Sequence, residues 1–297
     1  MTHTPRIGLH FDAAMAEALA ATARAIGRAD FFEAVLDLLG AVCAIDSGGA
    51  MVFFRTQRPR RLLHRVNPAD RSVPEESYID GPYALDPHYQ SFLQGAASGV
   101  YWLREVAPDD FFESEYYRQF YSQIGLSDSI DVMWRIDDDT ALLYFLERSA
   151  RNPTFQSADI AALNVVLPYV VAASARHNEL TTAGARPEVD TVTHRKVQST
   201  IDNFASSLLT QREREVLFYM LSGYSSALTA ERLHTSEGTI KIHRKNIHRK
   251  LDIGSQAELF SLFIKCIPFA APDEAVDPLH AYQSKPAKAI EGSLQKP

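Results

Sequence analysis

Residues 209–222 read LTQREREVLFYMLS and residues 236–251 read SEGTIKIHRKNIHRKL, and these two stretches decide the fold of the C-terminal part of the chain. Thr210 and Glu213 have the spacing of a capping box, in which each side chain satisfies a backbone N–H at the start of a helix. Gly223 is placed to end that helix. Three more helices are predicted over residues 225–233, 236–251 and 256–267. Two short helices, a turn and a helix rich in Lys and Arg form a helix-turn-helix.

The third of these helices separates its apolar and charged side chains. At 100° per residue, its buried stripe consists of Ile240, Ile247 and Leu251. The opposite side gathers Lys241, Ile242, Lys245 and Arg249. An isoleucine among three cations is typical of a face that enters the major groove, where an apolar side chain can contact a thymine methyl group. The alternative for such a run of charge is a solvated surface helix.

The net charge of the whole chain, −7, hides an uneven distribution. Residues 208–267 hold nine Lys and Arg and six Asp and Glu, which gives this segment +3 and leaves −10 for the rest. Chance clustering could produce a difference of this size. A basic segment on an acidic protein nevertheless indicates a nucleic-acid contact surface, and the placement of the cations on one helical face favours that interpretation.

The residues from Leu209 to Leu259 resemble the LuxR-type (NarL/FixJ-type) DNA-binding domain, over about a fifth of the chain. The motifs are LTxREREVL at 209–217, AERL at 230–233 and SEGTIKIHRKNIHRKL at 236–251. The resemblance implies a four-helix domain whose last helix supports dimerisation. It implies contacts to base edges from Lys241, Ile242 and Lys245. It implies contacts to the DNA backbone, or support of the helix, from Ser236, Thr239, His243 and Arg249.

The second helix departs from the family pattern. The family commonly has a charged pair and an isoleucine where this chain has Ala227, Leu228 and Thr229. A threonine places a hydroxyl where a core side chain is expected. We therefore expect the packing of this helix, or a contact that it makes, to be specialised.

The N-terminal half alternates helices with short strands. Helices are predicted at 11–27, 30–44, 87–95, 110–124 and 157–177. Strands are predicted at 50–55, 61–66, 99–104, 129–136 and 140–148. This order predicts an α+β fold in which an antiparallel sheet is flanked by helices, as in GAF and PAS domains. The expected organisation is a sensor domain at 10–178, a linker at 179–204, the DNA-binding domain at 205–267 and a largely disordered tail at 268–297.

Three kinds of partner domain are compatible with a LuxR-type reader. A phospho-acceptor receiver does not fit, because its parallel strands and acidic pair are missing. A GAF-like sensor fits the element order best, and the acyl-homoserine-lactone sensor has a similar plan. Tyr83-x-x-Asp86-Pro87 and Tyr101-Trp102 resemble motifs of the lactone sensor, whose Asp accepts a hydrogen bond from the ligand amide. The tryptophan expected before the Asp is absent.

The ligand-binding residues predicted on this basis are Tyr83, Asp86, Tyr101 and Trp102. An aromatic cavity with one carboxylate suits a small amphipathic ligand. In the alternative interpretation the aromatic side chains form a core and Asp86 caps the helix that begins at Pro87.

The sequence therefore predicts a ligand-responsive, cytoplasmic transcription regulator and no enzyme. The expected partners are double-stranded DNA, an unidentified small-molecule effector, a second copy of the chain and RNA polymerase. No membrane partner, metal or cofactor is expected, since Cys43 and Cys266 lie far apart and no apolar stretch reaches the length of a membrane span. Two alternatives remain open: a quorum-sensing regulator that binds acyl-homoserine lactones, and an interaction module that uses the four-helix domain only to dimerise.

Overall fold

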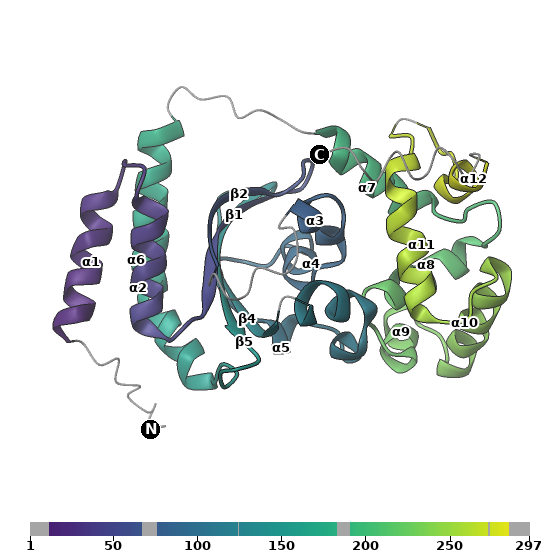
Figure 1. The fold of residues 1–297 in the computed structure, drawn as a ribbon, viewed down its shortest axis with the longest axis horizontal. Coiled ribbons are helices and arrows are strands. Elements are labelled where there is room, and N and C mark those ends of the chain that lie inside the picture. Colours follow the sequence, from purple (N-terminus) through teal and green to yellow (C-terminus); the bar gives the residue numbers. More distant parts are fainter. Residues whose placement is uncertain (1–11, 67–75, 124, 183–190, 273, 285–297) are drawn as a thin grey trace.

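The computed structural model describes residues 12–66, 76–123, 125–182, 191–272 and 274–284. Three layers of the N-terminal part and a helical C-terminal part lie side by side (Figure 1). A long-helix layer is at one end, the sheet follows, a layer of short helices covers the other face of the sheet, and the C-terminal helices pack against those short helices. The C-terminal part is therefore attached to one face of the N-terminal part.

The sheet has five strands in the order β2-β1-β5-β4-β3, and its strand pairs are antiparallel. The strands are β1 (Ser47–Phe54), β2 (Arg60–Arg65), β3 (Gly99–Trp102), β4 (Leu126–Arg135) and β5 (Thr140–Ser149). Successive side chains of a strand point to opposite faces, so each strand contributes to two cores. The α+β class and the antiparallel sheet flanked by helices are confirmed.

Two helices, α2 (Phe31–Val42) and α6 (Ser157–Thr182), cover the first face of the sheet, and α1 (Ala13–Ala25) packs on the outer side of α2 (Figure 1). The side chain of Asp12 caps α1 by accepting a hydrogen bond from the backbone N–H of Met15. His177 of α6 stacks on Phe31 of α2 with ring centroids 4.1 Å apart. These contacts fasten the long helices to one another above the apolar face of the sheet.

Helix α6 has an apolar outer side. Among the described residues, the span Ser157–Thr181 of this helix is long and apolar enough to cross a membrane by length and composition. Only 28% of its most apolar window is buried. Val165 is 53% exposed and lies near Pro168, which stands inside the helix. The face of α6 turned away from the sheet is thus apolar and uncovered within one chain.

Short helices cover the second face of the sheet. They are α3 (Glu76–Ile79), η2 (Pro82–Leu85), α4 (Pro87–Leu93), α5 (Leu103–Val106), η3 (Phe111–Glu113) and η4 (Tyr117–Ser122). The single helix predicted over 110–124 is wrong in detail, because η3 is a 3₁₀ turn and η4 has π-helical hydrogen bonding. The aromatic side chains of this segment point both toward the sheet and toward the C-terminal part.

The C-terminal part contains six α-helices among its described residues. They are α7 (Thr191–Asn203), α8 (Gln211–Leu221), α9 (Ser226–Arg232), α10 (Glu237–Leu251), α11 (Gln256–Cys266) and α12 (Pro278–Gln283). The four helices expected in the DNA-binding domain correspond to α8 to α11.

Two expectations outside that domain are wrong. The segment 179–204 is not a simple linker, because residues 179–182 continue α6 and 191–203 form α7, whose Val197 is fully buried. The segment 268–284 is not a disordered tail. Asp277 caps α12 and also accepts hydrogen bonds from the backbone N–H groups of Ala205 and Ser207, so this segment is tied to the loop before α8. Residues 285–297 lie outside the described residues.

Candidate nucleic-acid interface and effector site

The capping box at the start of α8 is present, and it reaches the third helix. Thr210 accepts a hydrogen bond from the backbone N–H of Glu213, and Glu213 accepts one from the backbone N–H of Thr210 at 2.8 Å. The same carboxylate oxygen accepts a hydrogen bond from Nζ of Lys250 at 2.7 Å. Burial raises the pKa of Glu213, but the hydrogen bonds from Lys250 and Thr210 lower it more, so the net shift is downward. This ion pair fixes the C-terminal end of α10 against α8.

Helix α10 buries the predicted stripe and exposes the predicted opposite face. The side chains of Ile240 and Ile247 are fully buried, and Leu251 is buried as well. The exposed set is Lys241, Ile242, Lys245 and Arg249. Ile242 is 63% exposed, which is more than any other exposed large apolar side chain among the described residues. Lys241 is held by an ion pair with Glu237 one turn earlier, so its ammonium group stays on the same side of the helix.

The other predicted DNA contacts near the start of α10 are Ser236, Thr239 and His243, and each makes or lies close to contacts within the domain. Ser236 caps the helix by accepting a hydrogen bond from the backbone N–H of Thr239, and their hydroxyl oxygens lie 2.8 Å apart. His243 is half-buried, and its buried Nδ1 has no hydrogen-bond partner. Ser236 is exposed and is available to a phosphate, whereas the ring of His243 lies partly inside the domain.

The unusual second helix accommodates its threonine through a local hydrogen bond. Thr229 is buried, and its hydroxyl donates to the backbone oxygen of Ser225 at 2.6 Å. A buried hydroxyl costs free energy unless it is bonded, and the preceding turn supplies the acceptor here. Ser225 also caps α9 by accepting a hydrogen bond from the backbone N–H of Leu228. The departure at Thr229 is therefore compatible with a normally packed helix-turn-helix.

Asp86 is the centre of a buried polar cluster in the N-terminal part. Its Oδ1 accepts a hydrogen bond from the backbone N–H of His88 at 2.8 Å, so Asp86 caps α4 as the sequence indicates. Its Oδ2 accepts hydrogen bonds from three tyrosine hydroxyls, those of Tyr78, Tyr116 and Tyr121, at 3.3, 3.1 and 3.2 Å. Burial, followed by the charge of Asp86, raises the pKa of all three tyrosines well above 10.0, which keeps them as donors.

The other three predicted ligand contacts do not join Asp86. Tyr83 is buried, and its hydroxyl oxygen lies 2.9 Å from Nδ1 of His194 in α7. Tyr101 and Trp102 are neighbours in β3 and point to opposite faces of the sheet. Tyr101 donates to the backbone oxygen of Ala97, and the Trp102 indole donates to Asp128. Of the four predicted ligand contacts, Asp86 is therefore the one that belongs to the buried polar cluster.

Two residues that sequence reasoning missed belong to the polar cluster around Asp86. Asp131 of β4 and His88 of α4 are buried, and Oδ2 of Asp131 lies 3.6 Å from Nδ1 of His88. Burial raises the pKa of Asp131 to about 7; the charge of His88 opposes this rise, and those of Asp86 and Glu147 add to it. Nδ1 of His88 has no hydrogen-bond partner. A carboxylate in the otherwise apolar strand SIDVMWRI is the signal that could have revealed this site.

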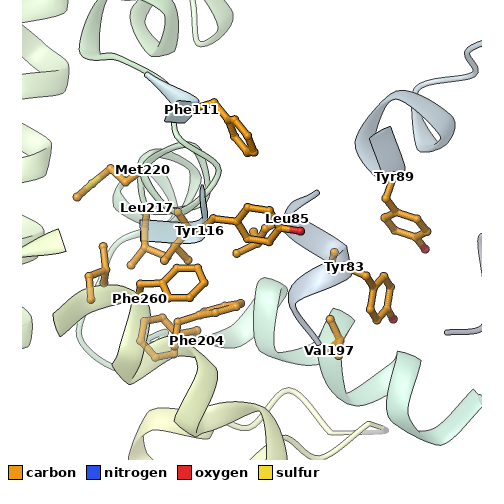
Figure 2. Packing of buried hydrophobic residues seen from close by; sticks show 14 of the residues in the cluster. Tyr83, Leu85, Tyr89, Phe111, Tyr116, Val197, Phe204, Leu217, Met220 and Phe260 are labelled. Carbon is orange, nitrogen blue, oxygen red and sulfur yellow. The ribbon is translucent and has the colours of Figure 1, made fainter. Parts of the chain in front are cut away.

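The polar cluster adjoins the interface between the two parts of the chain. Figure 2 shows Tyr116 beside Leu85 of the N-terminal part and beside Leu217 and Phe260 of the C-terminal part. The ring centroids of Tyr116 and Phe260 are 6.4 Å apart in an edge-to-face arrangement. One continuous apolar core thus joins the short helices of the N-terminal part to α8 and α11.

Backbone contacts accompany this shared core. Gly223 has a φ of +84°, and a Cβ added there would lie 2.9 Å from Cα of Phe111, so the two backbones approach closely. The backbone N–H of Ser225 donates to Oδ1 of Asp109 at 3.0 Å. Residues 109–111 therefore sit directly on the turn between α8 and α9.

A fold with a helix-turn-helix, a cation-bearing third helix and an appended α+β domain defines a DNA-binding transcription regulator. The sequence model of "Bacterial regulatory proteins, luxR family" matches residues 207–263. The protein described as "Putative HTH-type transcriptional regulator in exeN 3'region" of Aeromonas salmonicida is 30% identical over 184 residues, which cover 60% of this chain and 93% of that protein. The chain belongs to the luxR family of bacterial transcription regulators.

Two further similarities concern single parts of the chain. The response regulator protein TodT of Pseudomonas putida is 41% identical over 64 residues, which cover 22% of this chain and 27% of that protein. The crystal structure of the VqsR LBD domain from Pseudomonas aeruginosa aligns with a TM-score of 0.50 and 24% identity, over 57% of this chain and 99% of that one. The second similarity shows that the N-terminal part shares a fold with that domain.

Proposed function

We propose that this regulator reads DNA with the exposed face of α10, on which Lys241, Ile242, Lys245 and Arg249 enter the major groove. The observation that carries the proposal is the 63% exposure of Ile242 among cations, above a fully buried opposite side of the same helix. The cations supply attraction to phosphates and bases, and the isoleucine supplies an apolar contact to thymine. We further propose that residues 205–267 form the reader and residues up to 182 the sensor, and that the protein works in the cytoplasm.

Selection of duplexes from a random pool by the full chain provides the test, followed by fluorescence anisotropy on the selected duplex. Lys245→Ala is expected to weaken binding by about 5- to 100-fold, the range for one good base contact. Lys265→Ala removes an equally exposed lysine from α11 in the same domain, and it is expected to leave affinity unchanged. Equal effects of the two substitutions, or no selected sequence, would contradict the reading of DNA by α10.

We infer that the N-terminal part binds a small effector at Asp86 and Asp131. Both carboxyl groups are buried, and within the part of the chain that the structure describes the polar group beside Asp131 is His88, whose Nδ1 lies 3.6 Å from Oδ2 of Asp131. A buried carboxyl group that lacks full hydrogen bonding is stabilised by a ligand that brings a donor, such as an amide N–H, a hydroxyl or an ammonium group. The aromatic rings around Asp86 suit the apolar body of an amphipathic molecule.

Mass spectrometry of the protein purified under native conditions tests the effector site. Wild-type protein is expected to carry a small molecule that Asp86→Asn loses. Asp138→Asn changes an exposed aspartate in the turn after β4 and is the matched control. Retention of the same molecule by Asp86→Asn would place the effector site elsewhere.

We also infer that the protein is a homodimer that uses the outer face of α6. Val165, Pro168 and Ala172 are exposed there at helical spacing, and a contiguous apolar face on a soluble regulator indicates a protein contact. Sedimentation equilibrium is expected to give a dimer for wild type and a monomer for Val165→Asp. Val276→Asp, which places the same charge at another exposed valine, is expected to remain dimeric. A dimer that survives Val165→Asp would exclude this face.

A further inference from the structure

Tyrosine hydroxyl groups of the protein already donate hydrogen bonds to the carboxylate of Asp86, which the proposed effector would use as its acceptor. Oδ2 of Asp86 accepts hydrogen bonds from Tyr78, Tyr116 and Tyr121, at distances between 3.1 and 3.3 Å. A carboxylate oxygen has room for about two good donors, so a ligand donor at this oxygen has to displace at least one tyrosine. Binding at Asp86 and rearrangement of a tyrosine are therefore linked.

One of these tyrosines is also part of the interface with the reader. The ring of Tyr116 contacts Phe260 of α11 directly, and through Phe120, whose ring centroid is 5.3 Å from that of Tyr116 and 6.1 Å from that of Phe260. Among the described residues, the ring of Tyr121 contacts Phe111, Tyr116 and Tyr117, all of them in the N-terminal part. The side chain of Tyr116 thus connects the two sites: its hydroxyl bonds to Asp86 and its ring packs on Phe260 of the reader.

The docked arrangement is unfavourable for DNA. Asp109 accepts a hydrogen bond from the backbone N–H of Ser225 at the start of α9. Burial lowers the pKa of Arg244 in α10, and Asp110 is close enough for its charge to oppose that fall. These carboxylates add negative charge beside the helix-turn-helix, where duplex DNA brings phosphates. The docked part also covers Phe260 of α11, the helix expected to support dimerisation. Release of the reader removes both obstacles.

We propose that an effector donor competes with Tyr116 for Asp86, and that loss of the Tyr116 hydrogen bond releases the reader from the sensor and increases its affinity for DNA. This inference rests on the effector site at Asp86 proposed above. The Tyr116 hydroxyl acts as a positioning group: it holds the ring against Phe260 while the carboxylate is free of ligand. The docked reader is the low-affinity state, and the ligand shifts the population toward the released state.

Hydrogen exchange of the full chain measures the docking directly, because the Ser225 amide is bonded to Asp109 only when the reader is docked. Tyr116→Phe removes one hydroxyl and keeps the ring, and it is expected to raise exchange in residues 223–229 about tenfold and to tighten binding to the selected duplex by a similar factor. Tyr121→Phe removes an equivalent hydroxyl from the same carboxylate without a ring contact to the reader, and it is expected to change both values less than twofold. Equal effects of the two substitutions would overturn the route through Tyr116.

A second variant keeps the proposal testable if Tyr116→Phe weakens the fold, which faster exchange in β4 and β5 would reveal. Asp109→Ala opens the same interface at the surface and leaves Asp86 untouched, and it is expected to raise exchange in 223–229 and DNA affinity together. Unchanged DNA affinity in Asp109→Ala, despite faster exchange, would show that docking does not inhibit and would refute the proposal. Lys245→Ala in the same DNA assay tests DNA reading by α10 separately. A failure of that function can therefore be distinguished from a failure of the docking proposal.

Discussion

Asp131→Asn makes the most demanding test of the polar cluster beneath the sheet. Asp131 is buried, and its pKa is raised from 3.8 to about 7, chiefly by burial. Asparagine has nearly the same shape and carries no charge at any pH. The substitution therefore removes the cost of ionising this group inside the fold, and it also supplies a donor to a neighbouring acceptor.

The size of the effect follows from the two pKa values. In the unfolded chain the acid ionises near 3.8, whereas in the folded chain it keeps its proton up to about pH 7. The folded state binds more protons between these values, so the free energy of unfolding of wild type falls as the pH rises. Each pKa unit between 3.8 and about 7 corresponds to about 1.4 kcal/mol, so ionised Asp131 lowers the free energy of unfolding by about 4 kcal/mol above pH 7. About 2.5 kcal/mol of this is lost between pH 5 and pH 8.

Urea unfolding of both proteins at pH 5 and pH 8 measures this effect. The free energy of unfolding of Asp131→Asn minus that of wild type is expected to be about 2.5 kcal/mol larger at pH 8 than at pH 5. Subtracting the wild-type free energy of unfolding at each pH cancels the contribution of the other titrating groups. The control Asp138→Asn, in the exposed turn, is expected to differ from wild type by the same free energy at both pH values. A difference for Asp131→Asn that is independent of pH, or that shrinks toward pH 8, would show that the pKa of Asp131 is not raised in the folded protein.

Three further predictions concern the reader. Glu213→Gln is expected to cost about 1–3 kcal/mol at pH 7 through loss of the Lys250 ion pair. Because the pKa of Glu213 is depressed, this cost is present above its ordinary value of 4.5 and is lost as the pH falls through the lower folded value. A cost that does not shrink as the pH is lowered below 4.5 would contradict it. Gly223→Ala is expected to loosen the contact with Phe111, measured as faster amide exchange in 109–113, and unchanged exchange would argue against close docking. Ile242→Ala is expected to weaken binding to thymine-containing sites by about 1 kcal/mol with no change in salt dependence, and a reduced salt dependence would show that the residue acts indirectly.

The reader was predictable because its information is local. Capping pairs such as Thr210 and Glu213, and the spacing of Ile240, Ile247 and Leu251, specify helices and their buried sides within a few residues. The structure places these residues as the sequence indicates.

The proposed effector site was only partly predictable because strand geometry and distant contacts determine its composition. Tyr101 and Trp102 are adjacent in β3, and the alternation of side chains sends them to opposite faces, which a period-two analysis of this segment would have shown. Asp86 was found, but its tyrosine partners come from segments up to 35 residues away. The docking of Phe260 on Tyr116 joins residues 144 positions apart, and no local pattern contains it.

The central claim is that the exposed face of α10 enters the major groove, and a photocrosslink from position 242 tests it most directly. Ile242 is replaced by benzoylphenylalanine, the protein is bound to the selected duplex and illuminated, and the crosslinked base is located by sequencing. A crosslink to a base of the duplex is expected from position 242, and none from the same residue placed at Lys265. A bound duplex that crosslinks from position 265 and not from position 242 would contradict it.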